Sequence, residues 1–511
     1  MAMIFKHLML IMILLALAVS LPWTYFDSTS DKFIFIIGFV AIWRYGWAIQ
    51  HFVRALIYLK IKFKRLRQQE QNSGDEYIPI HVFLLITSFR IETETSITVY
   101  RSIIKEAINN GVDTTIIASL VETSDERLVK QIFYSFSPPK HIRLKLVLLD
   151  GTGKRDGLAA GFRAISNSQL HLEDTVVAVV DGDSILTKGS IEKCFKFFKL
   201  NPKLGALTTN EKCILQDNHK VTEIYRRWYN LRFSQRHEFM SSIALSNKVL
   251  TLTGRMSMFR GDIIGDSTFV ERVEFDFVDH WRLGRFRFLT GDDKSSWFHV
   301  LKDGWQMLYV PDVEVLTIES PPSENFLKGA TMLMSRWFGN MLRTNSRARE
   351  IPRKTTGNYV WWVLYDQLIS IWTSLFGLVL AIMGAIYFDK SIFLAFIFWI
   401  LLTRYLLTYL LSTLQGNFSF SWPFLVYFNQ IYGSMIKAYS LHHLYKQGWT
   451  RQKTTLKGSK SKIENTIKTT GSNLSLVSSV CVFLTTVAFI VGIFNLHDIN
   501  AFILYLKMRF I

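Results

Sequence analysis

Two carboxylates separated by one glycine, Asp181 and Asp183, follow the apolar run TVVAVV. Hard divalent cations bind carboxylate oxygens and often share substrate phosphates, so the pair predicts a Mg²⁺ or Mn²⁺ site that bridges a diphosphate. A calcium loop of the EF-hand type is excluded, because Ile185 and Leu186 stand where that loop needs a ligand and a glycine. A solvated turn is the simpler alternative, and the position of the pair at the end of a buried run argues against it.

A second acidic cluster lies in the segment FLTGDDKSSW, where Asp292 and Asp293 precede Lys294. Attack by a hydroxyl group needs a general base, and a carboxylate is a common choice. A solvated loop is the alternative here, but aromatic-rich segments flank the acids on both sides. Lys154 and Arg155 stand at the start of a predicted helix, which suits phosphate or nucleotide contact, although a basic helix start is more often only solvated.

These residues lie in a region of alternating apolar runs and amphipathic segments, which predicts an α/β layer fold. The predicted strands are residues 80–86, 114–121, 142–150 and 174–183, and the predicted helices include about 156–167 and 188–199. In such sheets, ligands bind beyond the carboxyl ends of the strands. The Asp181 and Asp183 pair falls at that edge, which explains why it follows a buried run.

The composition indicates a membrane protein with basic flanks rather than a nucleic-acid-binding protein. The chain has 511 residues, 49% of them hydrophobic, and a formal net charge of +18. Long apolar segments accompany the basic excess. The three cysteines are far apart and lack metal-ligand spacing, so we expect neither a disulfide framework nor a zinc site, and a reducing compartment for the main domain.

Five apolar segments are predicted to cross the membrane: residues 4–21, 33–48, 362–388, 392–414 and 476–494. The basic stretches 54–67 and 347–354 belong on the cytoplasmic side by the positive-inside rule, which places the N-terminus and the large domain in the cytoplasm. Residues 421–441 are expected to form an interfacial or re-entrant helix, since a crossing there would put the following basic loop outside. Residues 497–511 are too short to span unaided.

The predicted organisation has four parts. They are two N-terminal spans in 1–53, the α/β domain in 54–318, amphipathic interfacial helices in 319–358, and a C-terminal membrane region in 359–511 that contains the interfacial segment and a cytoplasmic basic loop. The expected fold class is therefore an α/β domain inserted between the transmembrane helices of a polytopic α-helical membrane protein.

The motifs together resemble the membrane-integrated family 2 glycosyltransferases, the group of cellulose, chitin and hyaluronan synthases, over about residues 30–455. The resemblance implies a GT-A fold, in which Asp181 and Asp183 match the DxD motif that binds nucleotide diphosphate and metal. TGDD matches the family's GDD motif, with Asp293 as catalytic base and Asp292 as its neighbour. GKR, with Lys154 and Arg155, matches an element that precedes DxD in hyaluronan-type synthases.

Other family motifs are present in altered form. TLTGRMSMFRGD resembles the acceptor-side loop, with Gly254 near the sugar, and Lys294 is assigned to the same side. The QxxRW motif survives as LMSRW, so Leu333 replaces the glutamine, while Arg336 is expected at the diphosphate and Trp337 at the acceptor sugar. QGWTRQK resembles a cytoplasmic gating loop, which assigns gating roles to Trp449 and Arg451. The altered segment SLVETSDE leaves Glu122 as the candidate for the nucleobase contact.

The surroundings of the motifs resemble a narrower group, the alginate polymerases, which are mannuronan synthase catalytic subunits of the bacterial inner membrane. The segments that carry this are DHWRLGRFRFLTGDDKSSWF, VPDVEV and SRWFGNMLR. The resemblance implies GDP-mannuronate as donor, a growing β-1,4-linked polymannuronate chain, and periplasmic and outer-membrane export proteins as partners. REIPR matches an RxxxR motif, but no DxSxxG accompanies it, so cyclic di-GMP is expected to bind a separate subunit.

Several alternatives remain open on the sequence. Another polysaccharide synthase could use a UDP-sugar, and a lipid-linked sugar transferase would make one transfer and release its product. A non-catalytic binding subunit is the third alternative, supported only by Leu333. Arg44 and Arg404 lie within predicted spans, either as pore-facing partners for uronate or in structural ion pairs or hydrogen bonds inside the bundle.

Overall fold

A computed structural model describes residues 2–27, 29–150, 153–168, 170–215, 222–416, 418–448 and 462–493, together with residues 495, 500, 501, 504 and 508. The chain divides into two compact units. The helical unit comprises Met1–Gln50, Asp366–His443 and Gly458–Ile511, and the α/β unit comprises His51–Tyr365 and Leu444–Lys457. The basic segment that starts at Leu444 therefore belongs to the α/β unit, although it is distant in sequence from the rest of that unit.

The α/β unit is built on an eight-stranded sheet with the order β3-β2-β1-β4-β7-β6-β10-β5. The strands are β1 (His81–Thr87), β2 (Thr114–Leu120), β3 (Ile142–Leu148), β4 (Thr175–Asp181), β5 (Ser184–Ile185), β6 (Leu204–Leu215), β7 (Met256–Arg260) and β10 (Gln306–Glu319). Strands β3, β2, β1 and β4 are parallel, and β7 runs antiparallel to both β4 and β6. The mixed sheet confirms the predicted α/β layer fold and the four predicted strands.

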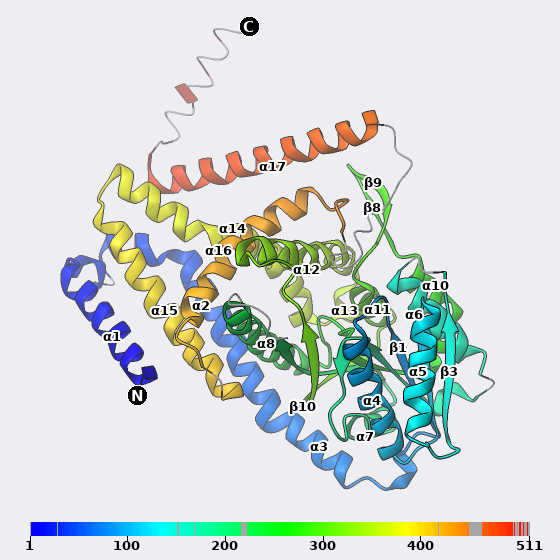
Figure 1. Cartoon of the computed structure of the whole chain (residues 1–511). Coiled ribbons are helices and arrows are strands. Elements are labelled where there is room, and N and C mark those ends of the chain that lie inside the picture. Colours follow the sequence, from blue (N-terminus) through cyan, green and yellow to red (C-terminus); the bar gives the residue numbers. More distant parts are fainter. Residues whose placement is uncertain are drawn as a thin grey trace. The chain divides into compact units, whose positions relative to one another are not determined.

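The helices of this unit begin and end where amphipathic segments meet turns. They are α3 (Phe63–Gln71), α4 (Thr93–Asn109), α5 (Thr123–Ser135), α6 (Lys154–Ser166), α7 (Glu192–Leu200), α8 (Thr222–Ala244), α9 (Gly261–Gly265), α10 (Ser267–Glu274), α11 (Asp292–Lys302), α12 (Phe326–Ala348) and α13 (Arg353–Thr356). Figure 1 shows α4, α5 and α6 beside strands β1 and β3. Each presents an apolar side to the sheet, which is the usual reason that such helices form.

The register of the central strands fixes where the acidic pair lies. Every residue of β1 is buried, and β4 is buried up to its last residue, as expected for parallel strands covered on both faces. Thr87, the last residue of β1, pairs with Asp181, the last residue of β4. Both strands therefore end at the same edge of the sheet, where the sequence predicts the ligand site.

Three further elements approach that edge from the C-terminal half of the unit. A hairpin of β8 (Phe277–His280) and β9 (Gly284–Arg287) leads directly into α11. Helix α12 follows β10 within the region 319–358, where the sequence predicts amphipathic interfacial helices. The 23-residue α12 carries Leu333, Arg336 and Trp337, so the altered QxxRW motif lies on one continuous helix.

The helical unit contains α1 (Ala2–Ser20), α15 (Ser391–Gln415), α16 (Trp422–His442), α17 (Lys462–Val491) and most of α2 (Asp31–Ile57) and α14 (Asn358–Tyr387). Among the described residues, three helices are long and apolar enough to cross a membrane: Asn358–Tyr387, Ser391–Gln415 and Ile463–Val491. They coincide with three of the five predicted spans. The segment His7–Ser20 is a shorter apolar helix. The spans at 4–21 and 33–48, and the interfacial role of 421–441, stay predictions.

The two arginines of the predicted spans both have hydrogen-bond partners within the helical unit. Arg44 Nη1 forms an ion pair with Asp366 Oδ1 at 2.8 Å, and Arg44 Nε donates to Thr373 Oγ1 at 3.0 Å. Arg404 Nε donates to the side-chain oxygen of Gln430 at 3.0 Å. These contacts favour the structural alternative for both arginines over a role in holding polymer.

Candidate active site

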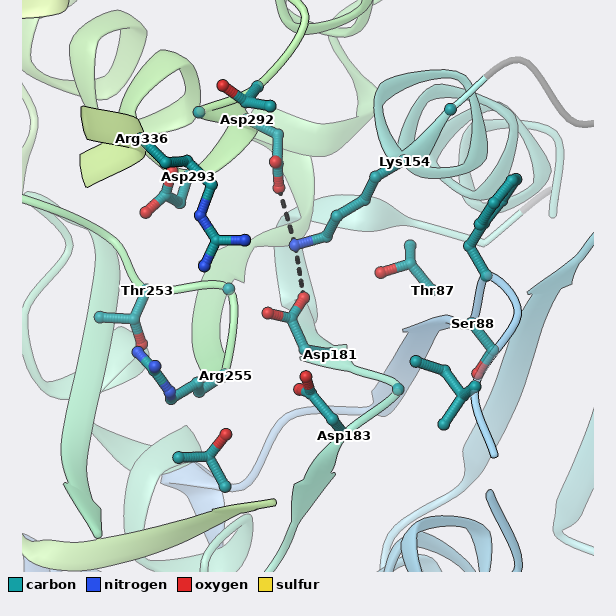
Figure 2. Close-up of a pocket in the computed structure, with 18 of the residues that line it drawn as sticks. Thr87, Ser88, Lys154, Asp181, Asp183, Thr253, Arg255, Asp292, Asp293 and Arg336 are labelled. Atoms are coloured by element: carbon teal, nitrogen blue, oxygen red, sulfur yellow. Dashed lines mark ion pairs between the residues drawn. The ribbon is translucent and has the colours of Figure 1, made fainter. Parts of the chain in front are cut away.

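A cavity of about 390 Å³ opens at the carboxyl ends of β1 and β4. Most of the residues that the sequence predicts for the site line it, namely Lys154, Asp181, Asp183, Gly254, Asp292, Asp293, Arg336 and Trp337. Figure 2 shows side chains from β4, α6, α11 and α12 around this space. The sheet edge, two helix N-termini and one helix face therefore bring together motifs that are distant in sequence.

Lys154 connects the two acidic motifs. Its ammonium lies 2.5 Å from Asp181 Oδ1 and 3.0 Å from Asp292 Oδ2, as the dashed lines in Figure 2 show. Burial acts to lower the pKa of Lys154, but the two carboxylates outweigh it and the pKa is raised, so the side chain stays cationic. A Cβ at Gly254 would lie 2.6 Å from Asp181 Oδ2 and 2.8 Å from the ammonium, so only glycine fits beside this ion triad.

The DxD turn is positioned by backbone contact with the end of β1. Gly182 N donates to Thr87 O at 3.1 Å, and a Cβ on Gly182 would lie 2.7 Å from Ser88 Oγ. The glycine between the two acids is therefore required by close approach rather than by flexibility alone. After this turn, the short strand β5 pairs with β10, which fixes the direction in which Asp183 leaves the sheet.

The donor set at the DxD turn fits a divalent cation. Among the described residues, no three His, Cys, Asp or Glu side chains form a metal-binding group by themselves. Mg²⁺ is usually held by one or two carboxylates together with substrate phosphates, so Asp183 with Asp181 beside it is the donor set expected for a cation that binds with a diphosphate. Both carboxylates line the same cavity.

The two acids at the start of α11 have pKa values displaced in opposite directions. For Asp292, burial acts to raise the pKa, but Lys154 and Arg155 outweigh it and the pKa is lowered. For Asp293, burial and the negative charge of Asp292 raise the pKa. Paired acids with separated pKa values are typical of a general base beside a permanently charged neighbour. This arrangement suits Asp293 for proton transfer.

The TGDD turn that carries these acids is held by α12. Gly291 adopts φ +86°, a left-handed conformation that favours glycine, and a Cβ there would lie 2.9 Å from the side-chain amide carbon of Asn340. Thr290 Oγ1 donates to Asn340 Oδ1 at 2.7 Å, and Arg343 Nη2 donates to the same oxygen at 2.6 Å. Sequence motifs do not indicate Asn340, because its role depends on a tertiary contact.

Two more contacts hold the segment before the turn. Leu289 N donates to Gln447 Oε1 at 2.9 Å, and Gln447 Nε2 donates to Arg287 O at 2.9 Å. Gln447 begins the motif QGWTRQK, so this motif contacts the segment that carries the predicted base. Its predicted gating residues Trp449 and Arg451 lie outside the described residues.

Arg155 also supports this turn instead of lining the cavity. It is buried, and its guanidinium donates to Val273 O at 2.7 Å, to Thr290 O at 3.1 Å and to Ser295 Oγ at 3.0 Å. The sequence predicts a contact with the nucleotide sugar for Arg155. The structure instead gives all three of these hydrogen bonds to groups around α11.

Two other predicted residues are not among the residues that line the cavity. Glu122 lies at the start of α5 and pairs with Arg90 at 3.4 Å. Lys294 donates to Leu250 O, its ammonium lies 4.7 Å from the centre of the Trp297 ring, and burial lowers its pKa to about 8. The nucleobase role of Glu122 and the acceptor role of Lys294 therefore have no support from cavity geometry.

The wall that α8 and the segment before β7 contribute carries two guanidinium groups to which the sequence analysis assigns no role. Arg236 and Arg255 line the cavity, and both donate to Glu211 Oε2 at 2.9 Å. Arg255 also pairs with Glu319 at 2.9 Å. The two arginines and the two carboxylates thus form one ion-pair network on this side of the cavity.

Comparisons with known proteins agree with this geometry. The family described as glycosyltransferase like family 2 matches residues 79–340. The glycosyltransferase alg8 of Pseudomonas syringae pv. tomato is 45% identical over 473 residues, which cover 92% of this chain and 94% of the relative. The glycosyltransferase alg8 of Azotobacter vinelandii is 43% identical over 477 residues, which cover 93% and 96%.

A solved mannosyltransferase from Pyrobaculum calidifontis, in complex with GDP-Man and Mn²⁺, is 12% identical with a TM-score of 0.44, covering 76% of this chain and 98% of that one. This level of likeness says nothing about the donor or metal of the present chain. The family match spans the sheet and the cavity, and the mixed sheet has the predicted GT-A-like form. The chain therefore belongs to the family 2 glycosyltransferases and, within them, to the alg8 group, the alginate polymerases.

Proposed function

We propose that the chain is a processive, inverting glycosyltransferase that polymerises mannuronate from GDP-mannuronate into β-1,4-linked polymannuronate and passes the polymer across the bacterial inner membrane. The observation that carries this is the cavity in which Lys154 joins Asp181 of the DxD motif to Asp292 of the GDD motif. A donor diphosphate at the first motif and an acceptor hydroxyl at the second would meet within one enclosed space.

The chemical step follows from the positions of the acids. Asp293 accepts the proton of the acceptor hydroxyl as the hydroxyl oxygen bonds to the anomeric carbon of the donor. The bond from that carbon to the diphosphate oxygen breaks, and GDP departs with the electron pair. Because attack and departure occur on opposite faces of the sugar, an α-linked donor gives a β-linked product.

The departing diphosphate needs positive charge beside it. Asp183, with Asp181 nearby, would hold a Mg²⁺ or Mn²⁺ ion, which when bound neutralises charge on the diphosphate. Arg336 and Lys154 line the cavity and contribute fixed cations. Arg336 is well suited to this because its planar guanidinium matches phosphate oxygens.

The remaining parts of the proposal concern the location of the chain in the membrane, the path of the polymer and the partner proteins. The α/β unit lies in the cytoplasm, and the spans carry polymer outward through the lipid bilayer, with Trp337 against the sugar at the entrance. A separate subunit binds cyclic di-GMP, and export proteins of the periplasm and outer membrane receive the chain. The motif resemblance and the relatives named alg8 support these assignments.

Membranes that contain this chain test the proposal when they are supplied with the partner subunit, cyclic di-GMP and either GDP-mannuronate or UDP-sugars. High-mass polymer that alginate lyase degrades should form from GDP-mannuronate alone. Asp293→Asn should reduce the rate by at least about two orders of magnitude, the usual loss when a general base is removed. Asp303→Asn, an exposed acid at the other end of α11, is the matched control and should retain activity.

The outcomes separate the alternatives. Polymer from a UDP-sugar alone would contradict the donor assignment and keep the synthase reaction. A single transfer without polymer would indicate a non-processive transferase. Full activity of Asp293→Asn would reject Asp293 as the base, and Mg²⁺ compared with Mn²⁺ in the same assay would identify the preferred cation.

A further inference from the structure

Arg232 on α8 contacts aromatic rings, and the described part of the chain offers its guanidinium no acidic partner. Its guanidinium carbon lies 4.3 Å from the centre of the Trp337 ring and 5.4 Å from that of Trp228. Among the described residues, no carboxylate forms an ion pair with it, although nearly every other arginine near the cavity has one or donates to a carbonyl. Arg232 is half-buried, and a guanidinium that is partly withdrawn from water without an ion-pair partner favours an anion beside it.

The neighbouring charges make that cost larger. Burial, together with the positive charges of Arg236 and Arg255, lowers the pKa of Arg232 to about 10. Arg255 has two carboxylates, Arg236 shares one of them, and Arg232 has none. The surplus positive charge of this wall is therefore concentrated at Arg232.

The location of the wall relative to the base is equally informative. Arg232 and Arg236 are four residues apart on α8, so they lie on the same face of the helix. Arg236 lines the cavity and lies close enough to Asp293 for that carboxylate to raise its pKa. Arg232 itself is not among the residues that line the cavity, but the Trp337 ring that it contacts is, so Arg232 lies next to a wall of the cavity.

We propose that Arg232 binds the carboxylate of the acceptor uronate while Trp337 packs against its ring, so that the pair selects an acidic chain over a neutral one. This inference rests on the proposed function. In a β-1,4-linked uronate chain, the attacking hydroxyl is on C4 and the carboxylate is carried by C5, the adjacent ring carbon. A guanidinium against the ring of Trp337, the residue expected at the acceptor sugar, is therefore placed to hold that carboxylate in a forked pair of hydrogen bonds.

The inference replaces Arg44 and Arg404 as the residues that recognise the acidic polymer. Arg44 has a carboxylate partner and Arg404 an amide partner within the helical unit. Arg232 has neither kind of partner and stacks on the tryptophan of the altered QxxRW motif. Cation–π contact leaves the edge of the guanidinium available, because stacking uses its face and hydrogen bonds use its rim.

Equilibrium binding of two labelled tetrasaccharides to the full-length chain in detergent tests this role. One ligand is β-1,4-linked mannuronate and the other is β-1,4-linked mannose, which differs by having a neutral CH₂OH at C5. The wild-type chain should prefer the acidic ligand by about tenfold or more, since a hydrogen-bonded charge pair is worth about 1.5–3 kcal/mol. Arg232→Gln should remove most of this preference, and Arg232→Lys should keep part of it.

Arg227→Gln is the matched control, since Arg227 is exposed on the same helix and pairs with Glu223. It should keep the preference. A wild-type chain without preference, or an Arg232→Gln chain that melts normally and keeps the preference, would overturn the inference. If Arg232→Gln does not fold, Arg232→Lys decides the question. A preference for the acidic ligand that is smaller than in the wild type supports the inference, and an unchanged preference overturns it.

Failure of this inference is distinct from failure of the proposed function. The ratio of the two affinities needs no donor, whereas the donor assignment is tested by polymer formation. Polymer from GDP-mannuronate together with an unchanged ratio in Arg232→Gln would reject only the role of Arg232. Polymer from a UDP-sugar alone would reject the donor assignment while the binding ratio still reported on Arg232.

Discussion

At the scale of single residues, Lys154 explains how two acidic motifs share one cavity. Without its ammonium, the carboxylates of Asp181 and Asp292 would repel each other across the space that a diphosphate must enter. With it, Asp292 keeps a lowered pKa and remains charged, while Asp293 has a raised pKa. One cation therefore separates an acid that stays ionised from an acid that exchanges a proton.

The raised pKa of Asp293 predicts the acid limb of the pH profile. A base must be ionised to act, so kcat/KM should fall as the pH is lowered through a pKa above the ordinary value of about 3.9. Asp292→Asn removes a negative charge that helps to raise this pKa, so the acid limb of the activity that remains should move to lower pH.

The measurement is kcat/KM from about pH 4 to pH 9, with Asp303→Asn as a control whose limb should match the wild type. A limb that stays in place or moves upward in Asp292→Asn would contradict the coupling between the two acids. It would also weaken the assignment of Asp293 as the base, because burial and the negative charge of Asp292 are the causes that raise its pKa.

Residue types predicted the acids of this site well but predicted its arginines poorly. Asp181, Asp183, Asp292 and Asp293 occur in short motifs whose chemistry is legible in sequence, and all four line the cavity. Arg236 and Arg232 lie in a long helix with ordinary basic composition. Arg236 lines the cavity and Arg232 contacts the lining residue Trp337 because of how α8 packs, and only the folded chain contains that information.

At the scale of elements, the segment from Arg287 to Asp293 is held from outside its own sequence neighbourhood. The Gln447 side chain forms hydrogen bonds with the backbone of Arg287 and Leu289, and the Asn340 side chain accepts a hydrogen bond from Thr290. A loop next to a sheet edge has few ladder hydrogen bonds of its own, so such contacts decide where its acids point. The proposed base, Asp293, is thus positioned by α12 and by the segment after α16.

Gln447→Ala removes two of these bonds. Each hydrogen bond contributes about 1 kcal/mol, so the loss of both should lower kcat by about tenfold or somewhat more. The KM for the donor should change little, because the DxD turn is held by the end of β1 and not by Gln447. Steady-state kinetics of the purified chain would measure both parameters.

Gln447→Glu retains the acceptor oxygen for Leu289 N and should recover part of the activity. Gln69→Ala, an exposed glutamine on α3, should leave both parameters unchanged. A variant in which only the donor KM changes would show that Gln447 acts on the donor side instead of on the base.

The sequence pattern predicts some strands of the sheet and not others. Strands β1, β2 and β4 are largely apolar runs because both faces are buried, whereas the edge strand β3 also carries exposed residues; the sequence pattern predicts all four to within two residues at each end. The sequence TLTGRMSMFRGD predicts an acceptor-side loop where the structure has strand β7. Its strand conformation comes from antiparallel pairing with both β4 and β6, which no local pattern reports.

At the scale of the whole chain, hydropathy predicts the long apolar helices α14, α15 and most of α17. The helices near residues 4–21 and 33–48 and the segment 421–441 are marginal in length or composition, so sequence alone assigns them less sharply. Sequence also places the basic loop after 441 in the cytoplasm, and the structure groups Leu444–Lys457 with the α/β unit. The two descriptions are compatible, since the α/β unit is the part expected in the cytoplasm.

The ion pair between Arg44 and Asp366 yields a prediction for the helical unit. Arg44→Leu leaves a carboxylate without its partner among apolar helices, and Asp366→Leu leaves a guanidinium in the same condition. Breaking a buried pair from one side costs about 3–5 kcal/mol, whereas replacing both partners by apolar residues is often nearly neutral. Each single variant should therefore melt well below the wild type in detergent, and the double variant should melt close to it.

If the losses of stability in the two single variants add up in the double variant, the pair has no structural coupling. If the single variants are stable but polymer export is lost, Arg44 belongs to the path of the polymer, and the structural assignment of this arginine is wrong.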